Sequence, residues 1–482
     1  MPHRISGAKL RTMSAEQTTD VIVIGAGAVG ENAAARVIQG GLSATLVESE
    51  LVGGECSYWA CMPSKALLRP GSALHSARAV AGSREAVTGT LDAQQVLARR
   101  DEFTSHWDDS SQVEWVKKTG ITLIRGRARL TGERRIEVTS DDGATTLVAR
   151  HAVVLATGST PTIPPIDGLD ALNFWGTREA TSAKEVPESL TVLGGGVAGA
   201  ELAQAYARLG SAVTLIARSG LLGSYPEPAA WLVQQGLKHD GVTLHLNTGT
   251  ESVAYDAGRF RVSLAGGTVV ESEKLLVSTG RHPALTGLGL EELGLGPRRL
   301  DTDDSGQVNG HPWLYAVGDA AGKVLLTHQG KYEARMTGDA IVARAKGELQ
   351  GPPERWGPFA ATADSYAVPQ VVFTDPEIAM AGRTLETARK DGLNVSETSL
   401  ELSVAGSSLH ADGYAGWAQM VVDEERKVLV GVTFAGPDVA ELLHAATIAI
   451  AGEVPLHRLW HAVPAYPTIS EVWLRLLEKY GL

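Results

Sequence analysis

Two cysteines, Cys56 and Cys61, are the residues whose type and spacing point most directly to chemistry. They are the only cysteines among 482 residues and lie five positions apart. In a reducing compartment such a close pair indicates redox or metal chemistry, because a structural disulfide framework needs more cysteines. Two thiols make a poor zinc site, and neither a CxxC motif nor a nearby histidine completes one. The sequence therefore predicts a redox-active pair and no bound metal.

The spacing of the two cysteines constrains the backbone that carries them. In an ideal α-helix, residues five apart have Cα atoms roughly 8–9 Å apart, whereas a disulfide needs less than about 7 Å. We therefore expect this segment to depart from a regular helix, with Gly53 and Gly54 supplying a flexible entry. A thiol at a helix start with a cation nearby has a lowered pKa and reacts faster.

A glycine fingerprint precedes the cysteines. Gly25, Gly27 and Gly30 form GxGxxG, and Glu48 closes the apolar run that follows. The surrounding pattern predicts a strand, a helix and a second strand over residues 21–24, 28–39 and 44–47. The first glycine makes the turn, the second lets backbone approach a pyrophosphate, and the third lets helix pack on strand. Glu48 can accept a hydrogen bond from a ribose hydroxyl, so a dinucleotide site is predicted.

The fingerprint recurs without a gap later in the chain, at Gly194, Gly196 and Gly199. Two dinucleotide sites in one chain are therefore implied. The shift that carries Gly25 onto Gly194 places Glu48 on Ala217, and Arg218 comes next. A missing carboxylate beside an arginine favours a 2′-phosphate, hence NADP over NAD. NADH remains an alternative if Arg218 is only a solvated residue at a strand end.

Three further segments resemble strand ends at such sites. Residues 153–159 and 275–281 both carry an apolar run into Thr-Gly, with the glycines at Gly158 and Gly280. Residues 314–319 end in Gly-Asp, which can present the Asp319 carboxylate where a parallel sheet binds ligand. The alternative for Asp319 is a helix N-cap.

Length, composition and charge limit the protein class. A chain of 482 residues predicts two to four domains. The net charge of −12 argues against nucleic-acid binding. No uninterrupted apolar run reaches the length of a membrane span, and the segment 1–18 lacks the apolar core of a secretory signal. We expect a cytoplasmic protein with a loose tail over that segment, in which Met13 is an alternative start.

The motifs together resemble the class I pyridine nucleotide-disulfide oxidoreductases, which include dihydrolipoyl dehydrogenase, glutathione reductase and mercuric reductase. The resemblance starts near residue 19. It rests on both fingerprints and on further segments, which are GGECSYWACMPSK at Gly53, ATGS at Ala156, STGRHP at Ser278, AVGDA at Ala316, VVFTDPE at Val371 and YPTISE at Tyr466. It implies an α/β fold with two Rossmann-like domains, for FAD and NAD(P), and a C-terminal α+β dimerisation domain.

The resemblance also implies boundaries and roles. The expected parts are an FAD-binding domain over 19–160 and 281–355, an NAD(P)-binding domain over 161–280 and an interface domain over 356–482. FAD would bind at Gly25, Gly27, Gly30, Glu48, Gly158 and Asp319, and NADPH at Gly194, Gly196, Gly199, Arg218 and Gly280. Cys61 would face the flavin and Cys56 the substrate. Lys65 and Glu201 would form an ion pair beside the reactive nitrogen of the flavin.

One departure from the family pattern concerns the residue that acts as acid and base. The family's HPTxxE segment supplies a histidine, paired with a glutamate, to the dithiol of the partner subunit. Here Tyr466 occupies the histidine position, while Glu471 is kept. The reference pKa of a phenol is about 3.5 units above that of imidazole, or roughly 4.8 kcal/mol in proton affinity. Ordinary disulfide reduction is therefore in question unless His461, five residues upstream, substitutes. Mercuric reductases resemble this chain at Tyr466, but their C-terminal cysteine pair is missing here.

Other departures surround the cysteine pair. Glu55 stands where the family has threonine, Ala60 replaces glycine, and Tyr58 with Trp59 adds bulk. Glu55 should disfavour the Cys56 thiolate by like charge. The two aromatic residues either pack or narrow the substrate entrance.

Three functional hypotheses follow. The first is a homodimeric enzyme that passes hydride from NADPH through FAD to the Cys56–Cys61 pair and on to a small-molecule acceptor, such as a disulfide. The second is a flavin-only reductase of quinones with a vestigial dithiol. The third is a non-enzymatic flavoprotein that serves as a binding or structural subunit.

Overall fold

The computed structural model describes residues 16–482, which form two compact units. Unit 1 comprises residues up to Gly54 together with Asp109–Gly158 and Pro283–Ala361. Unit 2 comprises Glu55–Asp108, Ser159–His282 and Thr362–Leu482. Met13 and most of the expected tail lie outside the described residues, and the first strand already begins at Gln17.

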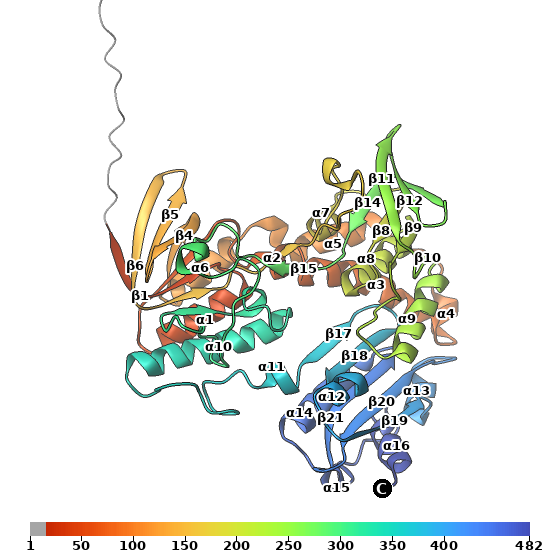
Figure 1. Ribbon diagram of the computed structural model, residues 1–482. Coiled ribbons are helices and arrows are strands. Elements are labelled where there is room, and N and C mark those ends of the chain that lie inside the picture. Colours follow the sequence, from red (N-terminus) through yellow and green to blue (C-terminus); the bar gives the residue numbers. More distant parts are fainter. Residues whose placement is uncertain (1–15) are drawn as a thin grey trace, which may run out of the picture. The chain divides into compact units, whose positions relative to one another are not determined.

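Unit 1 is built on a seven-stranded sheet in the order β3-β2-β1-β6-β5-β4, with β16 paired to β6. The pairs β1–β2, β2–β3, β1–β6 and β6–β16 are parallel, whereas β4 and β5 add an antiparallel edge. Helices α1 and α10 lie side by side on this sheet (Figure 1). The strands are β1 (Gln17–Ile24), β2 (Ala44–Glu48), β3 (Thr122–Arg125), β4 (Arg127–Gly132), β5 (Arg135–Ser140), β6 (Gly143–Leu155) and β16 (Leu314–Ala316). The helices are α1 (Ala28–Gln39), α6 (Ser110–Lys118), η3 (Leu290–Leu293), η4 (Gly318–Ala320) and α10 (Thr327–Ala345).

Unit 2 contains a second parallel sheet in the order β10-β9-β8-β14. Its strand order repeats β3-β2-β1-β6 of unit 1, and the repeat extends to register. Val21 pairs with Ala44 in the first copy, and Leu190 pairs with Val213 in the second, so that both partners are displaced along the chain by the same offset. The gapless repeat seen in the sequence is therefore a repeat of structure.

The elements of this second Rossmann-like fold follow one another closely in the chain. They are β7 (Ser159–Pro161), η2 (Leu169–Ala171), α7 (Thr177–Ser182), β8 (Ser189–Leu193), α8 (Val197–Arg208), β9 (Ala212–Ile216), α9 (Glu227–His239), β10 (Thr243–His245), β11 (Thr250–Asp256), β12 (Arg259–Leu264), β13 (Val269–Ser272), β14 (Lys274–Val277) and β15 (Arg281–Pro283). Strands β11, β12 and β13 form a separate antiparallel sheet, and β7 pairs with β15.

The C-terminal part of unit 2 is an α+β domain on a five-stranded sheet in the order β17-β18-β21-β20-β19. The buried faces of β20 and β21 pack against α14 and α16 in one apolar core. Its elements are α11 (Ala363–Tyr366), β17 (Pro369–Val372), β18 (Glu377–Gly382), α12 (Leu385–Lys390), β19 (Val395–Glu401), α13 (Ala405–His410), β20 (Trp417–Asp423), β21 (Val428–Gly436), η5 (Val439–Leu442), α14 (Leu443–Ala451), α15 (Leu456–Leu459) and α16 (Glu471–Tyr480). The expected fold class, two Rossmann-like domains and a C-terminal α+β domain, is confirmed.

A helical segment of unit 2 carries the cysteines. It consists of α2 (Gly54–Tyr58), α3 (Cys61–Arg78), α4 (Ser83–Ala86), α5 (Ala93–Phe103) and η1 (Ser105–Trp107). Helix α3 runs through Pro70 and Gly71, two residues that disfavour a helix interior. The missing N–H of Pro70 frees the carbonyl of Ala66, and Arg99 Nη1 donates to it at 3.2 Å. Gly71 leaves room for Arg208, because a Cβ there would lie 2.7 Å from its Cδ.

Candidate active site

The helix is interrupted between the two cysteines. Helix α2 ends at Tyr58 and α3 begins at Cys61, with Ala60 at φ −126° and ψ −94° between them. The two residues thus belong to different helices, which meets the expectation that a regular helix would hold them too far apart. Both residues are half-buried.

Side chains from two other elements secure this interruption. A helix break leaves carbonyl groups without their usual donors. The indole Nε1 of Trp107 donates to the carbonyl of Tyr58 at 3.1 Å, and the hydroxyl of Thr181 donates to that of Trp59 at 2.7 Å. The buried guanidinium of Arg100 holds α7 in turn, by donating to the carbonyl groups of Thr181 and Ala183.

Glu55, beside Cys56, is not an isolated charge. Its Oε1 accepts a hydrogen bond of 2.5 Å from Nε of Arg178 and also pairs with Nη2 of that residue. The Arg178 guanidinium lies over the Trp59 ring, 4.3 Å from its centroid. The like-charge effect expected from the sequence is therefore opposed by a cation. Tyr58 is buried and Trp59 half-buried, so packing accounts for Tyr58.

The expected ion pair between Lys65 and Glu201 is present. Nζ of Lys65 lies 2.7 Å from Oε2 of Glu201, whose side chain is only 3% exposed. The other oxygen, Oε1, accepts from the backbone N–H of Phe373 at 2.9 Å, and Lys65 Nζ lies 4.9 Å from the centroid of the Phe373 ring. Glu201 thus has a partner for each oxygen, as a buried carboxylate requires.

The glycines of unit 1 form a cradle that fits a dinucleotide. Gly25 has φ +99°, and a Cβ there would meet the carbonyl oxygen of Ala156 at 2.4 Å. A Cβ on Gly30 would meet the Gly25 carbonyl oxygen at 1.9 Å, whereas Gly27 has only Gly54 Cα within 4 Å, at 3.8 Å. The first and third glycines therefore permit close packing, and the second leaves the helix start open to a ligand.

Polar groups around this cradle also fit a bound nucleotide. The hydroxyl of Thr157, next to Gly158, is buried without a hydrogen-bond partner among the described residues. Glu48 is buried and accepts from the N–H groups of Ala26 and Glu50, both at 2.7 Å, so its carboxylate is held at the glycine turn. Asp319 is half-buried in η4 at the end of β16.

An acidic group in the first turn of α1 has a perturbed pKa. Burial raises the pKa of Glu31 to about 7, and the nearby Glu48 adds to the effect while Lys331 opposes it. Because the neutral form is populated at neutral pH, like-charge repulsion toward a pyrophosphate at this helix start is reduced.

The glycines of unit 2 repeat the same geometry. Gly194 has φ +127°, and a Cβ there would meet the carbonyl oxygen of Ser278 at 2.4 Å. Gly199 packs against Gly194, and Gly196 faces open space within 4 Å. Gly280, with φ +116°, follows the end of β14. Arg218 is exposed just after β9, where the first copy has the Glu48 strand end.

The segment that carries Tyr466 lies before α16. Tyr466 is 76% exposed, and His461 is also exposed. Glu471 is buried: its Oε1 pairs with Arg475 at 2.6 Å, and its Oε2 is buried without a hydrogen-bond partner within residues 16–482. The chain before it is packed closely, since a Cβ on Gly406 would lie 2.1 Å from the carbonyl carbon of Thr468.

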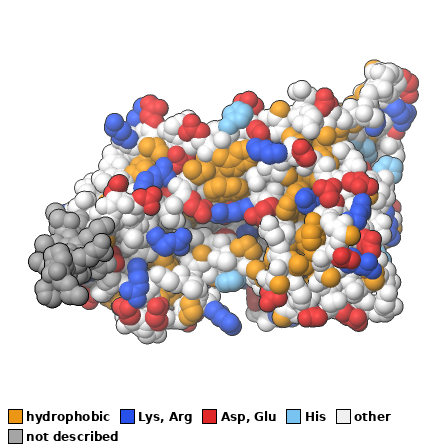
Figure 2. Space-filling view, turned by 90° about the horizontal axis from the view of Figure 1, so that it is seen from above, with side chains coloured by type: hydrophobic (Ala, Val, Ile, Leu, Met, Phe, Trp, Pro, Cys, Tyr) orange, Lys and Arg blue, Asp and Glu red, His pale blue; other side chains and the backbone are white. Residues whose placement is uncertain are grey.

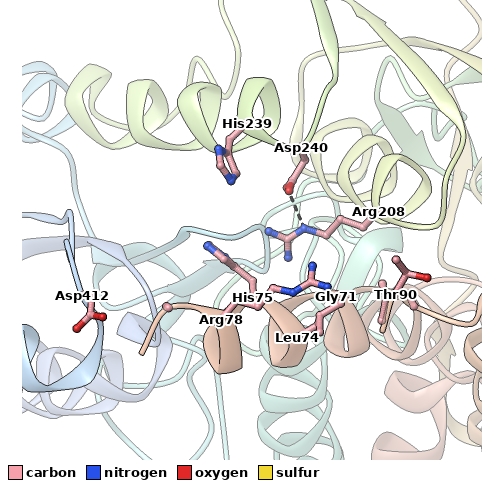
Figure 3. Close-up of a pocket in the computed structure, with 11 residues that line it drawn as sticks. Gly71, Leu74, His75, Arg78, Thr90, Arg208, His239, Asp240 and Asp412 are labelled. Atoms are coloured by element: carbon pink, nitrogen blue, oxygen red, sulfur yellow. Dashed lines mark hydrogen bonds and ion pairs between the residues drawn. The ribbon is translucent and has the colours of Figure 1, made fainter. Parts of the chain in front are cut away.

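A cluster of charges lies toward the other end of α3, around a cavity of about 480 Å³ (Figure 3). Arg208 is central: its Nε pairs with Asp240 at 2.8 Å and its Nη2 with Asp375 at 2.9 Å. Asp375 also bonds Nδ1 of His75. This hydrogen bond raises the pKa of His75, against a smaller opposing effect of burial. The cluster ties α3 to α8 and to the C-terminal domain.

Comparison with known proteins shows to which family this chain belongs. The family profile "Pyridine nucleotide-disulphide oxidoreductase" matches residues 19–338, and the dimerisation-domain profile of the same group matches residues 368–476. The chain belongs to the pyridine nucleotide-disulphide oxidoreductases. It is therefore an FAD-dependent enzyme that uses a pyridine nucleotide as electron donor.

Two curated relatives show how far the similarity extends. A dihydrolipoyl dehydrogenase from Thermus scotoductus is 33% identical over 477 residues, which cover 96% of this chain and 97% of the relative. A mercuric reductase from Acidithiobacillus ferrooxidans is 30% identical over 480 residues, covering 96% and 84%. These relatives carry two different activities at similar identity.

Solved structures share the fold. The HOCl-induced flavoprotein disulfide reductase RclA from Escherichia coli, as a Cu(II) complex, superposes with a TM-score of 0.81 at 21% identity, covering 96% of this chain and 99% of that one. LpdA from Mycobacterium tuberculosis superposes with a TM-score of 0.79 at 24% identity, covering 96% and 100%.

The described surface and helices add two observations. On the face seen in Figure 2, acidic and basic side chains are interspersed rather than gathered by sign. Within residues 16–482, no helix is long and apolar enough to cross a membrane, and no group of three or more metal-ligating side chains is arranged to hold an ion.

Several residues at the site were not predicted from the sequence. Arg178 and Thr181 reach the cysteine segment from more than 120 positions away, and no local pattern announces them. Phe373 contributes through its backbone and ring, and only its place in the VVFTDPE segment hinted at a role. Trp107 likewise has no signal beyond its residue type.

Proposed function

We propose that this enzyme takes electrons from NADPH and, through FAD and the Cys56–Cys61 pair, reduces a small disulfide. The observation that carries the proposal is the break between α2 and α3, which places the two cysteines on separate helices. The carbonyl groups of Tyr58 and Trp59 at this break still accept hydrogen bonds from side chains. Such an arrangement suits a pair that opens and closes a disulfide.

The residues of the two cradles would bind the cofactors. Gly25, Gly27, Gly30, Glu48, Gly158 and Asp319 would hold FAD, and Gly194, Gly196, Gly199, Gly280 and Arg218 would hold the nicotinamide dinucleotide. When bound, FAD supplies hydride acceptance and passes electrons on. The exposed Arg218, with no carboxylate at Ala217, supports NADPH over NADH.

The dithiol step balances as a thiol–disulfide exchange. The Cys56 thiolate attacks one sulfur of the acceptor disulfide and releases the first thiol. Cys61 then attacks the Cys56 sulfur, re-forming the Cys56–Cys61 disulfide and releasing the second thiol. Both leaving thiolates take up a proton. Lys65, paired with Glu201, is proposed to place its positive charge beside the flavin.

Tyr466 and Glu471 are proposed to serve proton delivery. The buried Oε2 of Glu471, which has no hydrogen-bond partner among the described residues, supports a polar role for this segment, and the exposed Tyr466 can donate a hydrogen bond. The C-terminal domain supports a homodimer, because it matches the dimerisation profile of the family.

An anaerobic titration with NADPH tests the dithiol. Purified enzyme should take up four electrons per flavin, two at the flavin and two at the cysteines. Uptake of only two electrons would overturn the proposed role of the cysteine pair. Cys56→Ser should abolish disulfide turnover and limit the uptake to two electrons.

A second candidate, a flavin-only reductase of quinones, is favoured by Tyr466 in the histidine position. In that case Cys56→Ser should leave quinone turnover intact. Restoring the acid/base by Tyr466→His should raise disulfide turnover about tenfold if proton transfer limits it, whereas Tyr466→Phe serves as the matched control that lacks the hydroxyl.

A further inference from the structure

The pair formed by Glu55 and Arg178 lies next to the thiol that we assign to the substrate. Glu55 directly precedes Cys56 on α2, and its carboxylate accepts a hydrogen bond of 2.5 Å from Nε of Arg178. The two side chains are each 41% exposed, so solvent weakens but does not remove their mutual attraction. The charge of Glu55 and the charge of Arg178 therefore act on Cys56 from nearly the same place.

The position of Arg178 is fixed on two sides. Its guanidinium lies over Trp59, at 4.3 Å from the ring centroid, which restricts its rotation. Thr181 lies three positions further along α7, hence on the same face of the helix, and donates to the Trp59 carbonyl at 2.7 Å. One face of α7 thus supplies both a hydrogen bond and a charge to the segment between the cysteines.

Other charged groups on the elements around this segment form pairs of their own. Lys65 pairs with Glu201, and Arg100 and Lys184 both pair with Asp101. Glu55 and Arg178 form a further pair, whose balance beside Cys56 a single substitution can change. Adjacent side chains on a helix do not face each other, so the Glu55 carboxylate acts on the Cys56 sulfur through its electric field rather than by contact.

We propose that Arg178 is a positioning residue that cancels the charge of Glu55 at Cys56 and thereby sets the pH at which this thiol becomes nucleophilic. This role of Arg178 rests on the proposed function, because it concerns the reactivity of Cys56 toward a substrate. Its test does not depend on that function. One uncompensated charge on the neighbouring residue, in a half-exposed setting, typically shifts a titration midpoint by about 0.5–1 pH unit. Removing the cation and removing the anion must shift it in opposite directions.

The test uses the FAD-loaded Cys61→Ser variant, in which Cys56 is the one remaining cysteine of the sequence. The rate of alkylation by iodoacetamide is measured against pH to give a midpoint. Adding Arg178→Gln should raise the midpoint by about 0.5–1 unit, and adding Glu55→Gln should lower it by a similar amount. The double substitution should return it to within about 0.3 unit of the parent.

Two further variants separate charge from shape. Arg178→Lys keeps the charge and should keep the parental midpoint, even though a lysine lacks the planar stacking on Trp59. Arg259→Gln breaks a matched ion pair with Glu188, with Arg259 also 41% exposed, and should leave the midpoint unchanged. In about 1 M KCl the shift caused by Arg178→Gln should shrink, because salt screens exposed charges.

Shifts of the same sign in Arg178→Gln and Glu55→Gln, or no shift in either, would overturn the proposal. Alkylation needs no turnover, so this result is independent of the electron acceptor. If NADPH titration shows an inert cysteine pair while the midpoints shift as stated, the proposed function fails and the role of Arg178 stands. If the pair accepts electrons and the midpoints do not move, the role of Arg178 fails alone.

Discussion

Replacing Lys65 by methionine removes the cation that pairs with the buried carboxylate of Glu201. Methionine keeps much of the side-chain length, so the change is chiefly one of charge. Of its two partners within residues 16–482, the carboxylate then retains only the backbone N–H of Phe373, at 2.9 Å, and its side chain is 3% exposed. Breaking a buried ion pair in this way typically costs about 3–5 kcal/mol.

The structure allows a closer estimate of that cost. The unpaired carboxylate can escape its charge by taking up a proton, and an ordinary glutamic acid with a pKa of about 4.3 does so at pH 7 for about 3.7 kcal/mol. This route sets the scale of the cost. Because the Lys65 side chain is 34% exposed, solvent already screens part of the attraction that is lost. We therefore expect a loss of about 2–3.7 kcal/mol in the free energy of unfolding at pH 7.

The sign of the pH dependence follows from the same reasoning. Protonation becomes easier by about 1.4 kcal/mol for each unit by which the pH falls. When protonation limits the cost, the difference in the free energy of unfolding between Lys65→Met and the wild type should therefore shrink from pH 7 to pH 5.5.

Urea unfolding of the FAD-loaded enzyme, followed by tryptophan fluorescence at both pH values, measures the effect. Lys118→Met is the matched control, because Lys118 and Glu114 form a pair whose side chains are 72% and 64% exposed. That control should cost less than about 0.5 kcal/mol. Lys65→Met combined with Glu201→Gln should recover part of the loss. A cost for Lys65→Met no larger than the control, or one that grows as the pH falls, would refute the reasoning.

Three further predictions concern pH and cofactor choice. The hydrogen bond with Asp375 raises the pKa of His75, so this pair contributes stability that is complete below about pH 6.5 and is lost as the pH rises through the raised value. His75→Gln should lower the Tm measured by circular dichroism more at pH 6 than at pH 9; equal losses would contradict this. Burial raises the pKa of Glu377 to about 7, so its ionised form becomes increasingly unfavourable above pH 4.5. Glu377→Gln should therefore stabilise the enzyme by up to about 3 kcal/mol at pH 8 and not at pH 4.5, and a gain equal at both values would count against it. Arg218→Ala should raise KM for NADPH at least about tenfold and that for NADH less than twofold; parallel changes would indicate a structural role.

Glycine spacing made much of the fold predictable. The helix expected over 28–39 is observed over the same residues, and the second copy reproduces the strand order and register of the first. These features follow from short-range geometry, because a turn with positive φ and a close helix–strand approach require glycine at fixed positions. The need for a break between the cysteines also follows from local geometry.

The environment of the cysteines was not predictable from local patterns. Glu55 alone implies an unopposed negative charge, and only the fold brings Arg178 to it from 123 positions away. The Pro70-Gly71 pair favours a helix end, yet α3 continues through it. In each case an interaction between residues far apart in sequence overrides a local preference. A pattern of neighbouring residues does not contain such an interaction.

The two weak positions in α3 bear on how this part of the protein folds. In isolation, a helix with proline and glycine at its centre should be unstable by about 4 kcal/mol relative to alanine at both places. It therefore gains order only when Arg99 of α5 donates to the carbonyl that Pro70 leaves free and Arg208 of α8 packs against Gly71. The stretch that positions Cys61 should then be a late event in folding, acquired together with the docking of its neighbours, and hydrogen exchange in α3 should report the loss of either arginine before any global unfolding.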